Sequence, residues 1–240
     1  MSFVLSKEFS EKKAVIIGAS GKIGSFLAKE LAPVVKDLVI HYDSQEVSLA
    51  NATVIQEHFD CLSPNFYTSI ENSRIIQEIQ TADILIICLG PFLQKPLHEM
   101  TFTQWNHITT LNYSLPGFFV SQGLQNMLTK KWGRIILFGG SRTDAVMGFK
   151  TNAAYAGAKT ALSSLAKSVA LAYGDRGITC NVILPGQLEN ESLEDFQKKA
   201  ISLMPENKGI SLETIKNALF LLLSSSEYNG TLLRIDRGWQ

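Results

Sequence analysis

Two patterns of apolar residues alternate along the chain. Short runs rich in valine, isoleucine and leucine are typical of buried strands, and longer segments with an apolar residue at every third or fourth position are typical of amphipathic helices. We predict strands over Lys13–Ile17, Leu38–His41, Thr53–Phe59, Ile84–Leu89, Arg134–Phe138, Thr179–Leu184 and Leu232–Ile235.

Helical periodicity fills the segments between these strands. One helix starts near Ile23, and isoleucines at helical spacing predict another within Ile70–Ile79. Thr101 has the side chain of an N-cap and predicts the start of a helix that runs toward residue 128. Ala153–Tyr173 and Leu212–Leu223 have the length and spacing of two further helices.

This alternation predicts a parallel sheet of about seven strands, flanked by helices on both faces. The apolar strand at 84–89 is continuous, as expected for a strand covered on both sides. Because no linker interrupts the pattern, we predict one doubly wound α/β domain over residues 1–240. In such sheets ligands bind beyond the carboxyl ends of the strands, so the turns after the first, fourth, fifth and sixth strands are the candidate site.

Composition and charge exclude several classes of function. Lysine plus arginine and aspartate plus glutamate both number 22, and no basic stripe argues for a nucleic-acid partner. No apolar run approaches the roughly 18 residues of a membrane helix, and the first residues lack the apolar core of a secretory signal. Three separated cysteines and four scattered histidines show no metal-ligand spacing. We therefore expect a cytoplasmic protein with no metal, membrane or nucleic-acid partner.

A glycine-rich turn follows the first strand. Gly18, Gly21 and Gly24 lie between that strand and an amphipathic helix. Glycines let the backbone turn tightly and approach a pyrophosphate, and the helix N-terminus offers unpaired N–H groups. The pattern therefore indicates a dinucleotide site, although a purely structural turn has the same spacing.

A tyrosine and a lysine share one face of the long helix. Tyr155 and Lys159 are four residues apart, so both side chains can point into one pocket. A free tyrosine has a pKa near 10, and a nearby ammonium lowers that pKa toward the range of a general base. Ser141 adds a hydroxyl after the fifth strand. Each signal alone also fits an ordinary surface pair, so their order along the chain carries the argument.

That order resembles the short-chain dehydrogenase/reductase family from about Lys12 to Trp239. The shared landmarks are a glycine turn, an acidic residue after the third strand, a glycine after the fourth, an asparagine within a helix, a serine, Tyr-x-x-x-Lys, Pro-Gly and a terminal Asp-x-Gly-Trp. They are Gly18–Gly24, Asp60, Gly90, Asn112, Ser141, Tyr155 with Lys159, Pro185 with Gly186, and Asp236–Trp239.

The resemblance implies a Rossmann-like fold and an NAD(P)(H)-dependent oxidoreductase that interconverts a carbonyl and an alcohol. Tyr155 would be the general acid/base, and Lys159 would lower its pKa and bind the nicotinamide ribose. Ser141 would hold the substrate carbonyl oxygen, and Asn112 would anchor a proton relay. The cofactor-binding candidates are Gly18, Ser20, Gly21, Lys22, Ile23, Gly24, Tyr42, Asp43, Ser44, Asp60, Cys61, Leu89, Gly90, Tyr155, Lys159, Pro185 and Gly186.

Three departures from the family pattern bear on these roles. Ile17 and Lys22 replace the usual threonine and middle glycine of the first turn. The apolar residues 87–89 replace the asparagines that usually stabilise the turn after the fourth strand. Ser141 lies one residue further from Tyr155 than the commonest spacing places the family's serine.

The end of the second strand decides between the two dinucleotides. Asp43 could bind a ribose diol and repel a 2′-phosphate, but Tyr42 occupies the usual acidic position. Ser44 and Lys22 could instead receive a phosphate. We favour NADP(H) over NAD(H) on this basis.

Two alternative functions stay open. A 3-oxoacyl carrier-protein reductase belongs to the same family, and the resemblance places Lys130, Lys131 and Arg176 where such enzymes meet an acidic carrier protein. A non-catalytic dinucleotide-binding sensor is the alternative from another class. We also expect self-association as a homotetramer or homodimer, because Ala153–Tyr173 is rich in small residues and poor in charge on more than one face.

Overall fold

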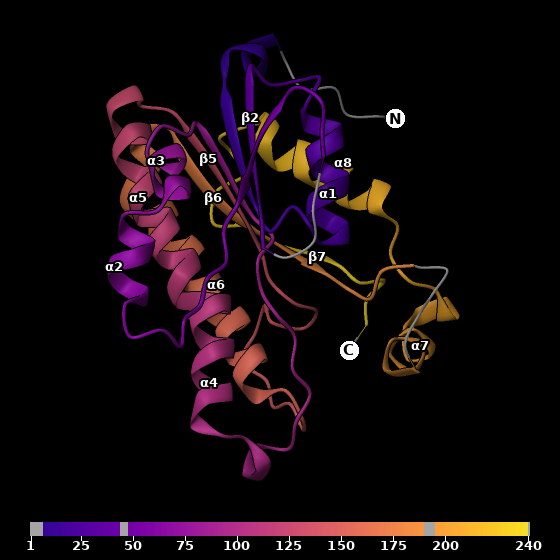
Figure 1. The fold of residues 1–240 in the computed structure, drawn as a ribbon. Helices are drawn as coiled ribbons and strands as arrows, with labels where there is room; N and C mark the ends of the chain where they lie inside the picture. Colours follow the sequence, from indigo (N-terminus) through magenta and orange to yellow (C-terminus); the bar gives the residue numbers. More distant parts are fainter. Residues whose placement is uncertain (1–6, 44–47, 190–194, 240) are drawn as a thin grey trace.

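The computed structural model describes residues 7–43, 48–189 and 195–239. Seven parallel strands form one sheet in the order β3-β2-β1-β4-β5-β6-β7 (Figure 1). The strands are β1 (Lys13–Ile17), β2 (Asp37–Tyr42), β3 (Ala52–Gln56), β4 (Ile84–Ile87), β5 (Gly133–Phe138), β6 (Ile178–Pro185) and β7 (Leu232–Ile235). Strand order reverses between β1 and β4, and this is where doubly wound sheets bind their ligands.

Helices connect these strands and cover both faces of the sheet. The α-helices are α1 (Lys22–Leu31), α2 (Phe66–Glu71), α3 (Arg74–Ile79), α4 (Phe102–Thr109), α5 (Leu115–Lys130), α6 (Ala153–Tyr173), α7 (Asp195–Ser202) and α8 (Leu212–Ser224). Short turns of other helix types lie at η1 (Lys7–Glu11), η2 (Leu97–Glu99), η3 (Thr110–Ser114), η4 (Gly174–Arg176) and η5 (Pro205–Asn207). The predicted fold class and strand number are therefore confirmed.

Successive strand residues point to opposite faces, and each face has its own core. Ile17 and Leu85 belong to the core beneath α3, α5 and α6, whereas Ile16 and Ile84 belong to the core beneath α1 and α8. Figure 1 shows α1 and α8 on one side of the sheet and α3, α5 and α6 on the other. Burial on both sides explains why the central strand β4 is apolar without interruption.

The sequence prediction extended β3 and β4 beyond the residues at which these strands end. β3 ends at Gln56 rather than at Phe59, because the chain leaves the ladder and Phe59 turns into the core to stack on His41. β4 ends at Ile87 rather than at Leu89, where the chain bends toward Gly90. In both places an apolar residue continues the sequence pattern after the strand has stopped.

The predicted helix after Thr101 is interrupted. Thr101 forms a capping box with Gln104, as its side chain indicated. The chain then passes through one π-helical turn at Thr110–Ser114 before α5 begins. π-helical turns within α-helices occur frequently at functional sites. Within the described ranges, no helix is long and apolar enough to cross a lipid bilayer.

Candidate functional site

The glycine turn packs β1, α1 and the end of β4 tightly together. A Cβ on Gly24 would overlap the Gly18 carbonyl oxygen and lie 2.9 Å from Ala19 Cα. Gly18 has φ of 83°, and a Cβ there would lie 2.9 Å from the backbone nitrogen of Leu89. Only glycine fits these close approaches, so the turn is held at the switch point between β1 and β4.

The N-terminus of α1 opens into a small pocket. Gly21 is the N-cap and provides no side chain to accept the first N–H groups of the helix. The pocket has a volume of about 210 Å³ and includes the exposed Lys22. Its lining residues are Gly18, Gly21, Lys22, Ile23, Gly24, Cys88, Phe138 and Leu188. Unpaired N–H groups beside a cation fit a pyrophosphate.

A second pocket of about 420 Å³ lies around Tyr155. It shares Ile23 and Leu188 with the pocket at the glycine turn, so the two pockets adjoin one another at the carboxyl edge of the sheet. We call these two adjoining pockets the sheet-edge trough. The Tyr155 pocket is lined by Ile23, Phe92, Gln94, Gly139, Gly140, Ser141, Arg142, Phe149, Asn152, Tyr155, Pro185, Gly186, Gln187, Leu188, Gln197, Ala200 and Trp239.

Tyr155 projects into this pocket from α6. Its ring meets Phe92 edge to face, with ring centroids 4.9 Å apart and planes at 87°. Burial raises the pKa of Tyr155 to about 12. This direction is opposite to the lowering that the sequence suggested, because burial of the hydroxyl disfavours the charged phenolate.

Lys159 is buried one turn further along α6. Its Nζ lies 5.9 Å from the centre of the Tyr155 ring and donates to the carbonyl oxygens of Leu89 at 3.1 Å and Phe138 at 2.8 Å. Burial lowers the pKa of Lys159 to about 8. An ammonium has three N–H donors, so two backbone bonds leave one donor for a ligand.

Asn112 lies in the π-helical turn and is fully buried. Its Nδ2 donates to the carbonyl oxygens of Pro91 and Ile108, both at 3.0 Å, while its Oδ1 has no partner among the described residues. A Cβ on Gly90 would overlap that Oδ1 and lie 2.8 Å from Lys159 Nζ. Because Gly90 has no side chain, Asn112 from η3 and Lys159 from α6 can approach one another.

Ser141 lines the pocket, but its hydroxyl is engaged elsewhere. It donates to Asp236 Oδ2 at 3.3 Å. The residue that faces the Tyr155 hydroxyl is Gly140, where a Cβ would lie 3.3 Å from that oxygen. The extra residue between the serine and the tyrosine thus places glycine opposite the tyrosine and turns the serine toward Asp236.

The candidates at the end of β2 form a polar cluster. Tyr42 is mostly buried, and its hydroxyl donates to Gln56 at 3.3 Å. Asp43 Oδ1 lies 2.6 Å from His58 Nδ1, with both side chains largely exposed. Ser44 lies outside the described residues. The Asp43 carboxylate therefore already has a partner at the place where a ribose diol would need it.

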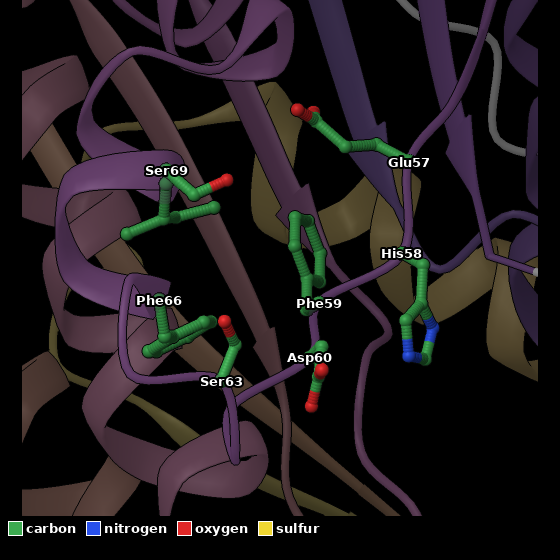
Figure 2. Close-up of a pocket in the computed structure, with 8 residues that line it drawn as sticks. Glu57, His58, Phe59, Asp60, Ser63, Phe66 and Ser69 are labelled. Carbon is green, nitrogen blue, oxygen red and sulfur yellow. The ribbon is translucent and has the colours of Figure 1, made fainter.

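Asp60 borders a separate pocket of about 140 Å³. Figure 2 shows Phe59 in this pocket across from Phe66 and Ser69, with Asp60 at one end. Asp60 Oδ1 accepts a hydrogen bond from the Leu62 backbone at 3.1 Å. The backbone N–H of Cys61, the neighbouring candidate, donates to the Phe59 carbonyl oxygen at 2.9 Å. Both candidates thus participate in the turn that follows β3.

The structure adds three pocket residues that the motifs did not single out. Gly140 faces the tyrosine hydroxyl, Phe92 packs on the tyrosine ring, and Arg142 brings a charge to the pocket. Arg142 follows Ser141 directly after β5, at the sheet edge where ligands were expected. A charged residue at that position was therefore a usable signal in the sequence.

Comparison with known proteins agrees with this arrangement. The chain is 30% identical to the 3-oxoacyl-[acyl-carrier-protein] reductase FabG of Escherichia coli over 240 residues, covering 96% of this chain and 98% of the relative. It is 26% identical to the D-beta-hydroxybutyrate dehydrogenase of Rhizobium meliloti over 220 residues, covering 88% and 83%. A short-chain dehydrogenase/reductase from Serratia marcescens has the same fold, with a TM-score of 0.80, 23% identity and coverage of 96% and 98%.

The family model for short chain dehydrogenases matches residues 12–200, most of the chain. This match confirms the family expected from the order of the landmarks. It also confirms the expected class of activity, an oxidoreductase acting on an alcohol/carbonyl pair. The chain belongs to the short chain dehydrogenase family.

Proposed function

We propose that this chain reduces a carbonyl compound, or oxidises the corresponding alcohol, with NAD(P)(H) bound along the sheet-edge trough. The observation that carries the proposal is that Tyr155 lines one pocket of the trough and the glycine turn lines the other, while Lys159, whose Nζ is 5.9 Å from the Tyr155 ring centre, meets Asn112 at Gly90. Relatives named as a reductase and a dehydrogenase match nearly the whole chain. Tyr155, Lys159 and Asn112 occupy the positions of the family's catalytic landmarks.

The residues present fit a dinucleotide. The uncapped N-terminus of α1 would hold the pyrophosphate, and Pro185 with Gly186 would border the nicotinamide in the Tyr155 pocket. The remaining donor of Lys159 would hold a ribose hydroxyl. A bound nicotinamide would supply or accept the hydride.

The proton would come from Tyr155. With its pKa raised to about 12, the phenol is protonated at neutral pH and can act as a general acid toward a carbonyl oxygen. The buried Lys159 ammonium stabilises the phenolate that remains after transfer. Asn112 Oδ1, which is buried and unpartnered among the described residues, would accept from a water that returns the proton to this end of the pocket.

Ser141 would hold the substrate oxygen after rotating about χ1 out of its bond with Asp236. The rotation leaves no unpaired charge, because Asp236 keeps Arg234 Nε at 2.9 Å and the Gly238 backbone at 3.1 Å. Gly140 leaves space beside Tyr155 into which that oxygen can fit.

We favour NADP(H) as the dinucleotide. Asp43 Oδ1 lies 2.6 Å from His58 Nδ1, so an NAD ribose diol would compete with His58 for this oxygen. Lys22 is exposed at the glycine turn and can meet the additional phosphate. Asp60 would then contact the adenine from the turn after β3.

A 3-oxoacyl carrier-protein reductase is the second candidate, because relatives with that name match nearly the whole chain. The basic residues expected to meet the carrier protein give it uneven support. Lys130 donates to the buried Asp83 at 2.6 Å, so this ammonium stabilises the fold. Arg176 is paired with Asp175 at 3.5 Å and remains exposed.

The test of the proposed function is NADPH and NADH oxidation by the purified protein over a panel of ketones, aldehydes, keto acids and 3-oxoacyl thioesters. Turnover of a panel member, with alcohol as the product, supports the proposal. Dinucleotide binding with no turnover of any panel member would instead identify a sensor, the alternative outside the enzymes.

We also propose self-association through α6. One side of this helix packs on the sheet through Leu162, Ala166 and Val169. The other side exposes Gly157 and a groove between α6 and the loop after β5, where Val146 and Leu171 are 95% and 91% exposed. Light scattering at micromolar concentration should give the mass of a dimer or tetramer, and a mass near 26.5 kDa would contradict this proposal.

A further inference from the structure

We infer that the Tyr155 pocket selects substrates carrying a carboxylate, and that Arg142 binds this group. The inference rests on the proposed function and specifies the substrate class of the same site. Arg142 is the one residue with a formal charge among the described residues that line the pocket. Its other polar lining groups are hydroxyls and the neutral amides of Gln94, Asn152, Gln187 and Gln197.

The charge of Arg142 is not neutralised within the described part of the chain. Its Nε is buried without a hydrogen-bond partner, and no described carboxylate lies within ion-pair distance of it. Two nearby acidic residues, Asp144 two residues further along the chain and Asp236 beside Ser141, are paired with another arginine. Asp236 lies 2.6 Å and Asp144 3.6 Å from Arg234.

The guanidinium is held in place rather than extended into solvent. Its central carbon lies 5.7 Å from the centre of the Phe149 ring, which also lines the pocket. Stacking on an aromatic ring leaves the edge of the planar guanidinium available for two parallel hydrogen bonds. The Arg142 backbone has φ of 64°, a conformation that residues with side chains rarely adopt and that occurs often at functional sites.

A carboxylate satisfies this arrangement better than other groups do. Its two oxygens match the guanidinium fork, and one negative charge balances the one positive charge. A neutral thioester, such as the carrier-bound substrate of the second candidate function, would leave the cation unpaired. A pocket of about 420 Å³ accommodates a small keto acid beside a nicotinamide.

The first test measures binding without turnover. Butanoate and butanamide have nearly the same shape, differ in charge and have no reducible ketone. Each is titrated by ligand-observed NMR into wild type, R142Q, R142K and the control R74Q, with and without saturating NADP⁺. Arg74 is an exposed arginine at the start of α3. Thermal unfolding of each variant establishes that it is folded.

We expect wild type and R74Q to bind butanoate about ten- to a hundred-fold more tightly than butanamide. R142Q should bind both equally, and R142K should keep part of the preference because it keeps the charge but loses the fork. Equal binding of the two compounds by wild type, or an unchanged preference in R142Q, would overturn the inference.

The second test compares turnover of 3-oxobutanoate with that of its methyl ester. Wild type and R74Q should prefer the acid in kcat/KM, and R142Q should lose this preference. Selective butanoate binding with no turnover of any carbonyl would refute the proposed function and leave the inference intact. Turnover of neutral ketones with no carboxylate preference in either test would support the proposed function and overturn the inference.

Discussion

The glycine turn and the Tyr155 pocket lie on the same edge of the same sheet, but they are built from different parts of the chain. At the glycine turn the backbone sets the geometry, because Gly18 and Gly24 permit contacts that no side chain would allow. At the Tyr155 pocket side chains from α6 and from the loops after β4 and β5 set the geometry. A spacing motif therefore determines the first region well and the second only in part.

Replacing Tyr155 by phenylalanine should have the largest effect, because it changes the Tyr155 pocket and leaves the glycine turn intact. The change removes the proton that the pocket transfers and leaves the ring that packs on Phe92. We expect turnover to fall by about 10²–10⁴, with dinucleotide binding largely kept because the glycine turn is untouched. Steady-state kinetics and fluorescence titration measure the two effects. A variant with near-normal turnover would remove Tyr155 from the role of general acid.

Sequence predicted most of the molecule because the fold depends on burial. A short apolar run marks each of β1 and β7, so both strands were located to the residue, and α6 was located by its small apolar face. The late ends predicted for β3 and β4 show the limit of this signal, since Phe59 and Leu89 remain apolar after leaving the ladder.

The candidate site was predictable as a set of positions but not as a set of contacts. The spacing placed Tyr155 and Lys159 on one helix face, which the structure also shows. It could not reveal that burial raises the tyrosine pKa, because burial depends on Phe92 from another segment. Nor could spacing alone show that Gly140, rather than Ser141, faces the tyrosine.

Ser141→Ala tests whether the serine acts despite that orientation. We expect turnover to fall about 10²-fold if the hydroxyl rotates to hold the substrate oxygen, which is the usual cost of removing one such donor. Gly140→Ser in the same background should restore part of the activity, since a side chain there would face Tyr155 after a shift of a few tenths of an ångström. A loss of less than about threefold in kcat would show that the bond to Asp236 is the only role of Ser141.

The burial of Lys159 should make the free energy of unfolding depend on pH. Burial lowers its pKa from 10.5 to about 8 in the folded chain, while the unfolded chain retains the ordinary value. Between these pH values the unfolded state binds a proton that the folded state does not, so raising the pH favours folding at this residue. Relative to Lys159→Met, the wild-type free energy of unfolding should therefore rise by at most about 1.4 kcal/mol per pH unit.

Urea denaturation of both proteins between pH 8 and 10.5 measures this difference. Lys167→Met is the control for removing a lysine from the same helix, because Lys167 is exposed. If the difference in free energy of unfolding between wild type and Lys159→Met stays constant or falls as the pH rises, the folded Lys159 retains its proton.

The smallest expected effect concerns Lys22 at the glycine turn. Because Lys22 is exposed, its contact with a 2′-phosphate is worth only about 0.2–1 kcal/mol, so Lys22→Ala should weaken NADPH binding by roughly 1.4- to fivefold. NADH binding should not change, and added salt should reduce the difference. Lys29→Ala, on the exposed side of α1, is the matched control. Equal weakening of NADPH and NADH binding would place Lys22 at the pyrophosphate that both dinucleotides share. The glycine turn would then bind the pyrophosphate through the Lys22 side chain as well as through its backbone.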